Sequence, residues 1–270
     1  MAIRLLLVAF SIFLTNAASA QTACKSLVGK TYALTPFDML VAAFGSLGPK
    51  GEFETTADYE ARRNASVGTA ARTVIIPKQP EGLEYFEYDA DAQKLKVLSY
   101  AFDNTGLDVW SAFYAAELYG KIDVNTFGNV EVVISREENP TGSHVASNAY
   151  GATVDVLEIA WTTRAIFDRQ GDGTSGLDYG LFPSADNSPY VVGELSLAPA
   201  EAQRLKPTLQ VGFVVTPREP YLVTGRHKVG KTTIQNPRAI TEDFSILIAD
   251  IQCGVVMDSS DKILMAYPTR

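Results

Sequence analysis

The stretch FSILIADIQCGVVM at residues 244–257 is the most apolar strand candidate of this chain. It is shorter than the roughly 18 apolar residues that indicate a membrane-spanning helix, and Asp250 and Gln252 lie inside it. This pattern favours a strand buried in a protein core over a membrane span. We therefore expect a soluble mature chain with no transmembrane segment.

Short alternating or β-branched runs lie between this strand and residue 73, and one more follows it. We expect further strands at residues 73–76, 85–88, 94–98, 130–135, 153–159, 190–197, 209–215 and 262–265. Pro77 is expected to end the first of these strands, because proline cannot donate to a ladder. Residues 89–92, which read DADA, are expected to form the turn of a hairpin.

Three short helices are also predicted. Residues 36–44 begin with proline and are followed by glycine, and residues 55–65 begin with the T-x-x-D pattern of an N-terminal cap. Residues 198–205 have Pro199 at their start and are followed by Pro207. The fold class is therefore α+β and β-rich, with short N-terminal helices followed by an antiparallel β region.

This order of elements divides the chain into four parts. They are a signal peptide at 1–20, a small helical segment at 21–72, a β-rich region at 73–140 and a β-rich C-terminal region at 141–270. Within residues 145–257 the order strand, strand, short helix, strand, strand resembles an OB-type barrel. We expect an OB-like barrel in the C-terminal region.

The N-terminus has the features of a cleavable export signal. Arg4 is followed by an apolar run at residues 5–14 and then by Ala-Ser-Ala at residues 18–20, the small-x-small pattern of a cleavage site. We expect cleavage between Ala20 and Gln21 and export to a bacterial periplasm.

The chain is acidic, with 23 Lys and Arg against 31 Asp and Glu and a net charge of −8. Removal of residues 1–20 takes away Arg4 and no acid, which moves the net charge to −9. No run of Lys and Arg forms a basic patch in the sequence. Because such a chain repels phosphate backbones, no nucleic-acid partner is expected.

Cys24 and Cys253 are the only cysteines. They form an even pair in an oxidising compartment, and neither has a metal-ligand spacing. We expect a disulfide that ties the start of the mature chain to the apolar strand. The alternative is two free thiols, with Cys253 acting as a small buried apolar residue.

Residues 225–232, GRHKVGKT, match the phosphate-loop pattern G-x4-G-K-[ST]. A phosphate loop works because its last residues open a helix whose N-terminus faces the phosphates. Here Pro237 follows Thr232 by five residues, which leaves room for barely one turn. We interpret the segment as a loop that binds no nucleotide, with no phosphate contact for Lys231.

Residues 171–176, GDGTSG, match the dinucleotide pattern G-x-G-x-x-G, but a turn-rich sequence follows where a helix is needed. Asp168, Asp172 and Asp178 could supply oxygen ligands to calcium, but Tyr179 stands where an EF-hand needs a bidentate glutamate. We expect a solvated loop and assign no cofactor or metal.

His144 and His227 are the only histidines. This excludes an H-E-x-x-H zinc motif and any three-histidine site, and no G-x-S-x-G elbow is present. A Ser-His-Asp site that uses either histidine stays open, because such triads assemble in space rather than in sequence. No catalytic residue is assigned.

Five short stretches of the sequence together form a recognisable pattern. They are EFETTADYEAR at 52–62, YDAD at 88–91, SNAYG at 147–151, PY at 220–221 and TIQNP at 233–237. With these strings the chain resembles a group of exported proteobacterial proteins, in which phenylalanine usually stands at the position of Tyr150. The resemblance implies no activity, and it implies that the loop around His227 is not a phosphate loop.

The sequence thus favours a periplasmic, non-enzymatic protein that binds a ligand or a partner through its β-rich C-terminal region. One alternative is a periplasmic hydrolase that uses His144 or His227. Another is an accessory factor in envelope assembly.

Overall fold

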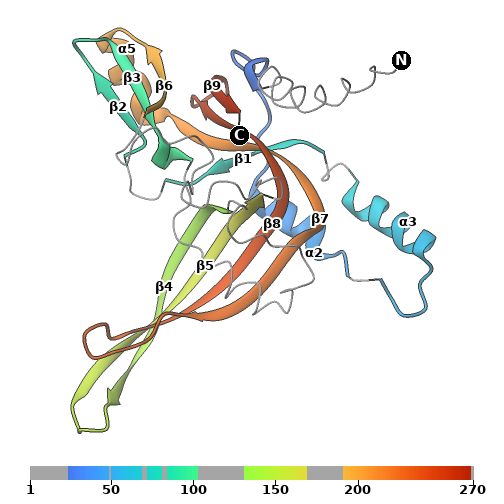
Figure 1. Ribbon diagram of the computed structural model, residues 1–270, viewed down its shortest axis with the longest axis vertical. Coiled ribbons are helices and arrows are strands. Elements are labelled where there is room, and N and C mark those ends of the chain that lie inside the picture. The colour runs from blue at the N-terminus through green and yellow to red at the C-terminus, as the bar shows by residue number, and fades with distance from the viewer. Residues whose placement is uncertain are drawn as a thin grey trace, which may run out of the picture.

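The computed structural model describes residues 24–48, 50–68, 72–80, 84–102, 131–168 and 191–268. The predicted signal peptide, its cleavage site at Ala20 and Gln21, and the glycine-rich segment 171–176 lie outside these ranges. Strands dominate the described part and the helices are short (Figure 1), which confirms the β-rich α+β class. No helix in the described ranges is long and apolar enough to cross a bilayer.

The larger of two sheets has β8 at its centre. Its six strands are β1 (Val74–Lys78), β4 (Glu131–Ser147), β5 (Thr153–Asp168), β7 (Gln210–Val229), β8 (Arg238–Met257) and β9 (Ile263–Pro268). The order is β1-β7-β8-β5-β4, and β9 pairs with the end of β8. β5 and β8 run parallel and the other pairs are antiparallel. The predicted apolar strand is therefore the middle of the sheet.

The smaller sheet contains β2 (Phe86–Asp89), β3 (Lys94–Leu98) and β6 (Val191–Ser196), in the order β2-β3-β6. β2 and β3 form the predicted hairpin, and the Asp89 carboxylate accepts a hydrogen bond from the Ala92 amide at 2.9 Å within its turn. A 3-10 turn, η1 (Ser99–Ala101), follows β3.

An OB-like barrel is not observed among the described strands. β6, which the OB-type order needs in the same barrel as β7, pairs with β3 in the smaller sheet instead. That pairing sets Leu95 opposite Leu195 and brings Lys94 within 3.6 Å of Glu194, cross-strand contacts that element order does not reveal. The larger sheet stays open, although its two end strands approach where the Gln79 amide donates to the Ile134 carbonyl at 2.8 Å.

The predicted helices form close to their expected bounds, as α2 (Phe37–Gly45), α3 (Thr56–Val67) and α5 (Pro199–Leu205), the last continued by η2 (Lys206–Thr208). The Thr55 hydroxyl accepts a hydrogen bond from the Asp58 amide at 3.1 Å, which confirms the predicted cap. α2 buries three apolar side chains, and the ring of one of them, Phe44, stacks on Tyr221 of β7 at 4.9 Å.

Pro77 does not end β1, contrary to expectation. β1 continues to Lys78, and Pro77 lies opposite Gly212 of β7. β1 is the end strand of the sheet path, and an edge strand tolerates proline because one side of it needs no ladder donor.

Four strands are much longer than predicted. The segments expected at 130–135, 153–159, 209–215 and 244–251 are only parts of β4, β5, β7 and β8. The added residues of β4, of β7 and of the start of β8, together with the predicted segment 153–159 of β5, form a projection below the body of the molecule (Figure 1), whereas the added residues 160–168 of β5 extend into the buried half of the sheet. The expected boundary between residues 140 and 141 falls inside β4.

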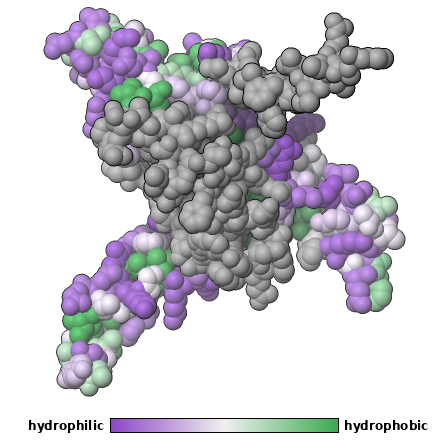
Figure 2. All heavy atoms as spheres, in the orientation of Figure 1, coloured by the Kyte–Doolittle hydropathy of each residue, from purple (hydrophilic) through white to green (hydrophobic). Residues whose placement is uncertain are grey.

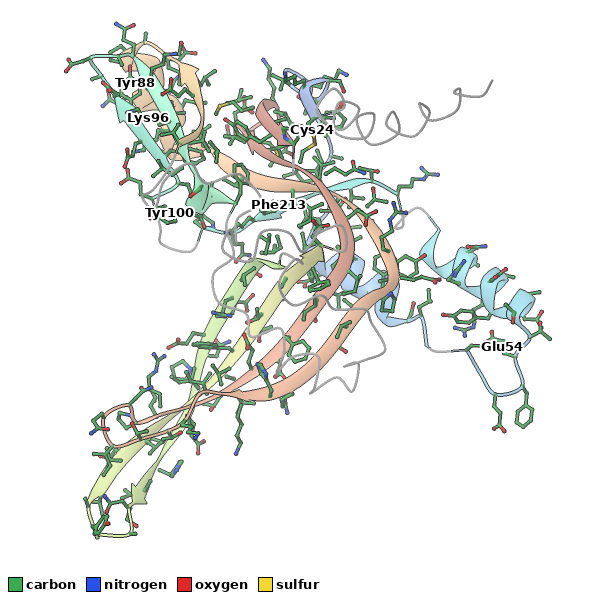
Figure 3. All side chains as sticks on the ribbon, in the orientation of Figure 1. Cys24, Glu54, Tyr88, Lys96, Tyr100 and Phe213 are labelled. Carbon is green, nitrogen blue, oxygen red and sulfur yellow. A yellow bond between two sulfur atoms is a disulfide. The ribbon has the colours of Figure 1, made fainter. Side chains whose placement is uncertain are left out.

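The predicted disulfide is present. Cys24 and Cys253 are bonded, with their Cα atoms 5.9 Å apart, and both side chains are buried beside Ile263. The bond joins residues 229 positions apart, so the chain-entropy model assigns it an upper figure of about 5 kcal/mol. Figure 3 shows Cys24 near β9, at the end of the molecule opposite the projection, with Phe213 within the body.

Candidate functional site

The lower parts of β4, β5, β7 and β8 form an arm, which we define as residues 137–158 and 225–240. Side chains 137–145 are all exposed, as are those of the turn at 230–236. Beyond β7 and β4, the described residues supply no further strand to cover the arm's two edges. The arm is therefore ordered backbone with most of its side chains open to solvent.

Hydrogen bonds at its two turns hold the end of the arm. In the β4–β5 turn, the Asn148 side-chain oxygen accepts from the amides of Tyr150 at 2.9 Å and Ala152 at 3.0 Å. The Leu157 amide donates to the Pro237 carbonyl at 2.9 Å, which ties the β4–β5 hairpin to the β7–β8 turn. This bond joins the β7–β8 turn to the side of the β4–β5 hairpin, whose own turn lies further along the arm.

The sides of the arm carry side chains that are hydrogen-bonded to one another. Glu158 pairs with His144 at 2.8 Å, and Glu138 accepts from Arg238 at 2.7 Å and from the Trp161 indole at 3.0 Å. The Trp161 hydrogen bond, supported by Arg238, lowers the pKa of Glu138.

Four large apolar side chains are exposed toward the end of the arm. Val145 is 68 % exposed, Tyr150 96 %, Leu157 41 % and Ile234 45 %. Figure 2 shows hydrophobic side chains interspersed with hydrophilic ones along this projection. Isolated exposed apolar residues are common, and four of the nine large apolar side chains that are exposed among the described residues lie on this projection.

The β7–β8 hairpin concentrates positive charge. Arg226, Lys228, Lys231 and Arg238 lie in it, and no acid occurs from residue 220 to 241. Lys228 and Lys231 are exposed and form no ion pair with a described residue. The search of the sequence for an uninterrupted run of Lys and Arg missed this cluster, because its four cations are not contiguous.

A buried polar cluster lies at the root of the arm. Glu242, 2 % exposed, accepts hydrogen bonds from the Thr163 hydroxyl at 2.5 Å and from Arg136 at 3.2 Å. His227 Nε2 lies 2.7 Å from the same carboxylate, and its buried Nδ1 has no hydrogen-bond partner among the described residues. The cluster joins β4, β5, β7 and β8 where the packed body ends.

Each histidine therefore has a glutamate partner, His144 on the exposed arm and His227 at its root. Within the described residues neither imidazole makes a hydrogen bond to a serine, and the hydroxyl nearest to His227 in the cluster, that of Thr163, donates to Glu242. The described geometry thus offers no assembled Ser-His-acid site to support the hydrolase alternative.

The segment that matches the phosphate loop is mostly strand. Residues 225–229 pair with β8, with His227 opposite Glu242, so the expectation of a loop is wrong for these five positions. Gly225 is needed there because a Cβ would lie 2.4 Å from the ring of Phe244 on β8. After Gly230 a turn leads directly to β8, and no helix N-terminus follows to face a phosphate.

Asp168, one of the three candidate calcium ligands, has a structural contact. Its buried carboxylate accepts a hydrogen bond from the Ile251 amide at 3.1 Å. Asp172 and Asp178 lie outside the described residues. Within the described ranges no group of three or more His, Cys, Asp or Glu side chains could hold a metal.

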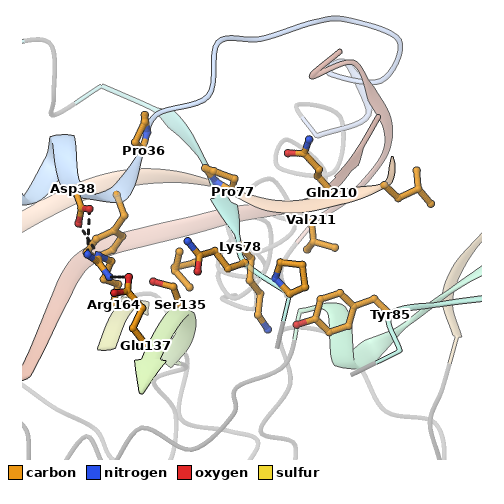
Figure 4. A pocket seen from close by; sticks show the side chains of 15 residues that line it. Pro36, Asp38, Pro77, Lys78, Tyr85, Ser135, Glu137, Arg164, Gln210 and Val211 are labelled. Atoms are coloured by element: carbon orange, nitrogen blue, oxygen red, sulfur yellow. Dashed lines mark hydrogen bonds and ion pairs between the residues drawn. The ribbon is translucent and has the colours of Figure 1, made fainter. Parts of the chain in front are cut away.

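A pocket of about 390 Å³ lies where α2, β1, β4 and β5 meet (Figure 4). Arg164 on its wall pairs with Asp38 at 2.6 Å and Glu137 at 2.9 Å, and these contacts raise the pKa of its guanidinium. The buried Lys78 ammonium lies 5.4 Å from the centre of the Tyr85 ring. The volume suits a small ligand, but the Arg164 charge on the wall is already compensated.

Comparison of the chain with protein-family models, with curated proteins and with solved structures finds no match. The arm, the root cluster and the pocket are therefore interpreted from their own chemistry.

Proposed function

We propose that this chain is an exported, non-enzymatic binding protein whose arm docks on another component of the bacterial envelope. The observation that carries the proposal is the arm itself, in which residues 137–145 and 230–236 are exposed on strands and turns that are nevertheless ordered. The mature chain would act in the periplasm.

The cost of ordering the arm supports a binding role. Fixing the backbone costs roughly 1–2 kcal/mol per residue, and in the body of the protein this is offset by burial of apolar side chains. Most of the arm buries little, so its ladders and ion pairs hold it with a small margin. An arm that is already ordered lowers the entropy that a partner must overcome on docking.

The Cys24–Cys253 disulfide supports export. Such bonds persist in oxidising compartments and are rare in the cytosol of most organisms. Together with the signal-peptide pattern at residues 1–20, this favours the periplasm as the place of action.

Photo-cross-linking in living cells tests the proposal. A photoreactive residue is placed in the arm at Ser143, Thr153 or Thr233, and as a control in the body at Glu201 or Asp261. We expect adducts, whether with protein or lipid, from the arm positions and few or none from the two body positions.

A shortened arm supplies the second half of the test. Residues 144–156 and 230–239 are each replaced by Asn-Gly, which favours a two-residue hairpin turn. We expect the thermal midpoint of the body to change little and the adduct from a probe retained at Ser143 to disappear. Equal adducts from arm and body, or undiminished adducts in the shortened protein, would contradict the proposal.

A further inference from the structure

We infer that the pocket where α2, β1, β4 and β5 meet binds a small organic carboxylate with an apolar body. Its volume of about 390 Å³ falls in the range of about 300–1,000 Å³ that is typical of small-molecule sites. Among its lining residues only Glu137 belongs to the arm. Binding in this pocket would therefore be independent of docking by the arm.

The local fold brings polar and apolar side chains together at this pocket. β1 and β4 approach where the Gln79 amide donates to the Ile134 carbonyl at 2.8 Å. A β-bulge interrupts the β4–β5 register between Val133 and Ser135. Bulges re-aim the side chains beside them, and here the consecutive residues Ile134 and Ser135 both line the pocket. The bulge thus sets a hydroxyl beside an apolar wall.

The Ser135 hydroxyl is a buried donor that a ligand can use. Ser135 is 2 % exposed, and its hydroxyl has no hydrogen-bond partner among the described residues. The large majority of buried hydroxyls are hydrogen-bonded, because a buried polar group without a partner is costly. A ligand oxygen in the pocket would accept this hydrogen bond.

The charges on the pocket wall differ in burial. Asp38 and Glu137, the two acids among the fifteen lining residues, are 68 % and 53 % exposed, and both accept hydrogen bonds from Arg164. Lys78 is only 5 % exposed, and Figure 4 shows it pointing toward Tyr85, on the side of the pocket away from that group. Water and salt screen exposed charges more strongly than buried ones. The wall therefore favours an anion beside Lys78.

These groups fit a carboxylate that is attached to an apolar body. An ammonium and a hydroxyl both donate to a carboxylate, and hydrogen bonds to an ionised acceptor are about twice as strong as neutral ones. The wall also includes the buried side chains of Phe37, Ile134 and Val211. An apolar body would cover these side chains, whereas a free inorganic anion would leave them uncovered.

Fluorine NMR titration of the mature chain, residues 21–270, tests the inference with three probes of one shape. They are para-trifluoromethylbenzoate, the neutral para-trifluoromethylbenzamide and the cationic para-trifluoromethylbenzylamine. We expect the benzoate to bind about tenfold more tightly than the benzamide, and the benzylamine to bind least. Inorganic phosphate at equal concentration should not displace the benzoate.

Two variants of the wall place the carboxylate beside Lys78 and Ser135. K78M keeps the length of the side chain and removes its charge, so it should weaken benzoate binding by about tenfold and leave benzamide binding unchanged. S135A should weaken benzoate binding by about threefold. The control K30M removes a charge from an exposed lysine elsewhere, and it should bind both probes as the parent does.

D38N supplies a test in the opposite direction. It removes one of the two carboxylates that accept from Arg164, so the wall becomes more positive. Benzoate should bind about twofold more tightly and benzamide as before. Because Asp38 is 68 % exposed, the thermal midpoint should change little. A merely structural role of these residues would not tighten benzoate binding.

Four outcomes overturn the inference. They are equal binding of benzoate and benzamide, an undiminished benzoate preference in K78M, displacement of benzoate by phosphate, and no binding of any probe at millimolar concentration. If K78M does not fold, unchanged benzoate affinity in both S135A and D38N overturns it instead. Cross-linking by the arm is unaffected in each case.

Discussion

The two halves of β8 show how one strand can serve two purposes. From Ile246 to Ala249 consecutive side chains are fully buried, so both faces of the sheet are covered. From Arg238 to Thr241 all side chains are partly exposed, yet β7 and β5 pair with this half as they do with the other. Hydrogen bonding continues while burial falls away. The arm therefore has strand geometry but leaves its side chains free for other contacts.

The two His–Glu pairs show the same contrast between buried and exposed surroundings. His227 and Glu242 are 2.7 Å apart with side chains 8 % and 2 % exposed, whereas His144 and Glu158 are 2.8 Å apart and 52 % and 47 % exposed. The distances are nearly equal and the surroundings differ. In the buried pair each partner depends on the other, because water cannot replace it.

The largest expected effect on stability comes from comparing an apolar residue of the packed body with an apolar residue of the arm. Phe213 on β7 is fully buried and packs edge to face on Phe102 at 5.8 Å, so F213A should lower the free energy of unfolding by about 3–5 kcal/mol. V145A, at a side chain 68 % exposed, should change it by less than about 0.5 kcal/mol. Urea denaturation measures both. A loss above about 1 kcal/mol for V145A would mean that the arm packs against something in the free protein.

The second largest expected effect on the free energy of unfolding comes from comparing substitutions of Glu242 and Glu158. E242Q leaves Arg136, Thr163 and His227 around a neutral amide in a buried site, and we expect a loss of about 2–3 kcal/mol. E158Q, at the exposed pair, should cost less than about 0.5 kcal/mol. Thermal and urea unfolding of the two variants gives the difference. Similar losses for both would show that burial does not separate the root of the arm from its sides.

The sequence predicted the parts of the fold whose signals are local or depend on burial. The Thr55 cap, the hairpin turn at Asp89 and the apolar half of β8 were each predicted from such signals and confirmed. The Cys24–Cys253 bond was predicted because the chain has only two cysteines and its N-terminus has the pattern of an export signal.

The arm was predicted only in part, at residues 153–158 of β5. Apolar alternation marks a strand only where one face is buried, and residues 137–145 contain no buried face and include Pro140. Residues 225–229 read as a loop for the same reason. The cluster of Glu242 with His227, Thr163 and Arg136 joins four strands, so no sequence spacing reveals it. Lys228 and Lys231 lie close together in the sequence, and the structure adds that neither forms an ion pair with a described residue.

The smallest expected effect concerns an ion pair on the arm. Arg226 donates to both carboxylate oxygens of Asp243, at 2.5 and 2.8 Å, and these hydrogen bonds hold the pKa of Asp243 below its usual value. The pair is largely solvated, with side chains 69 % and 42 % exposed, so its contribution is small and weakened by salt. It should appear in local opening of the arm rather than in global unfolding.

The pH dependence of this pair has a definite sign. Because the pKa of Asp243 is lower in the folded arm than in the unfolded chain, where it is near 3.9, the stabilisation is present above about pH 4 and is lost as pH falls through the folded value. Amide hydrogen exchange along residues 224–229 and 240–245 measures it. At pH 6 and low salt, D243N should reduce protection there by less than about fivefold. The difference should shrink below pH 4 and in 1 M NaCl, and R226Q combined with D243N should add little to D243N alone. A loss that is larger, or equal at both salt concentrations, would show that this part of the arm is shielded from solvent and belongs with the packed half of the sheet.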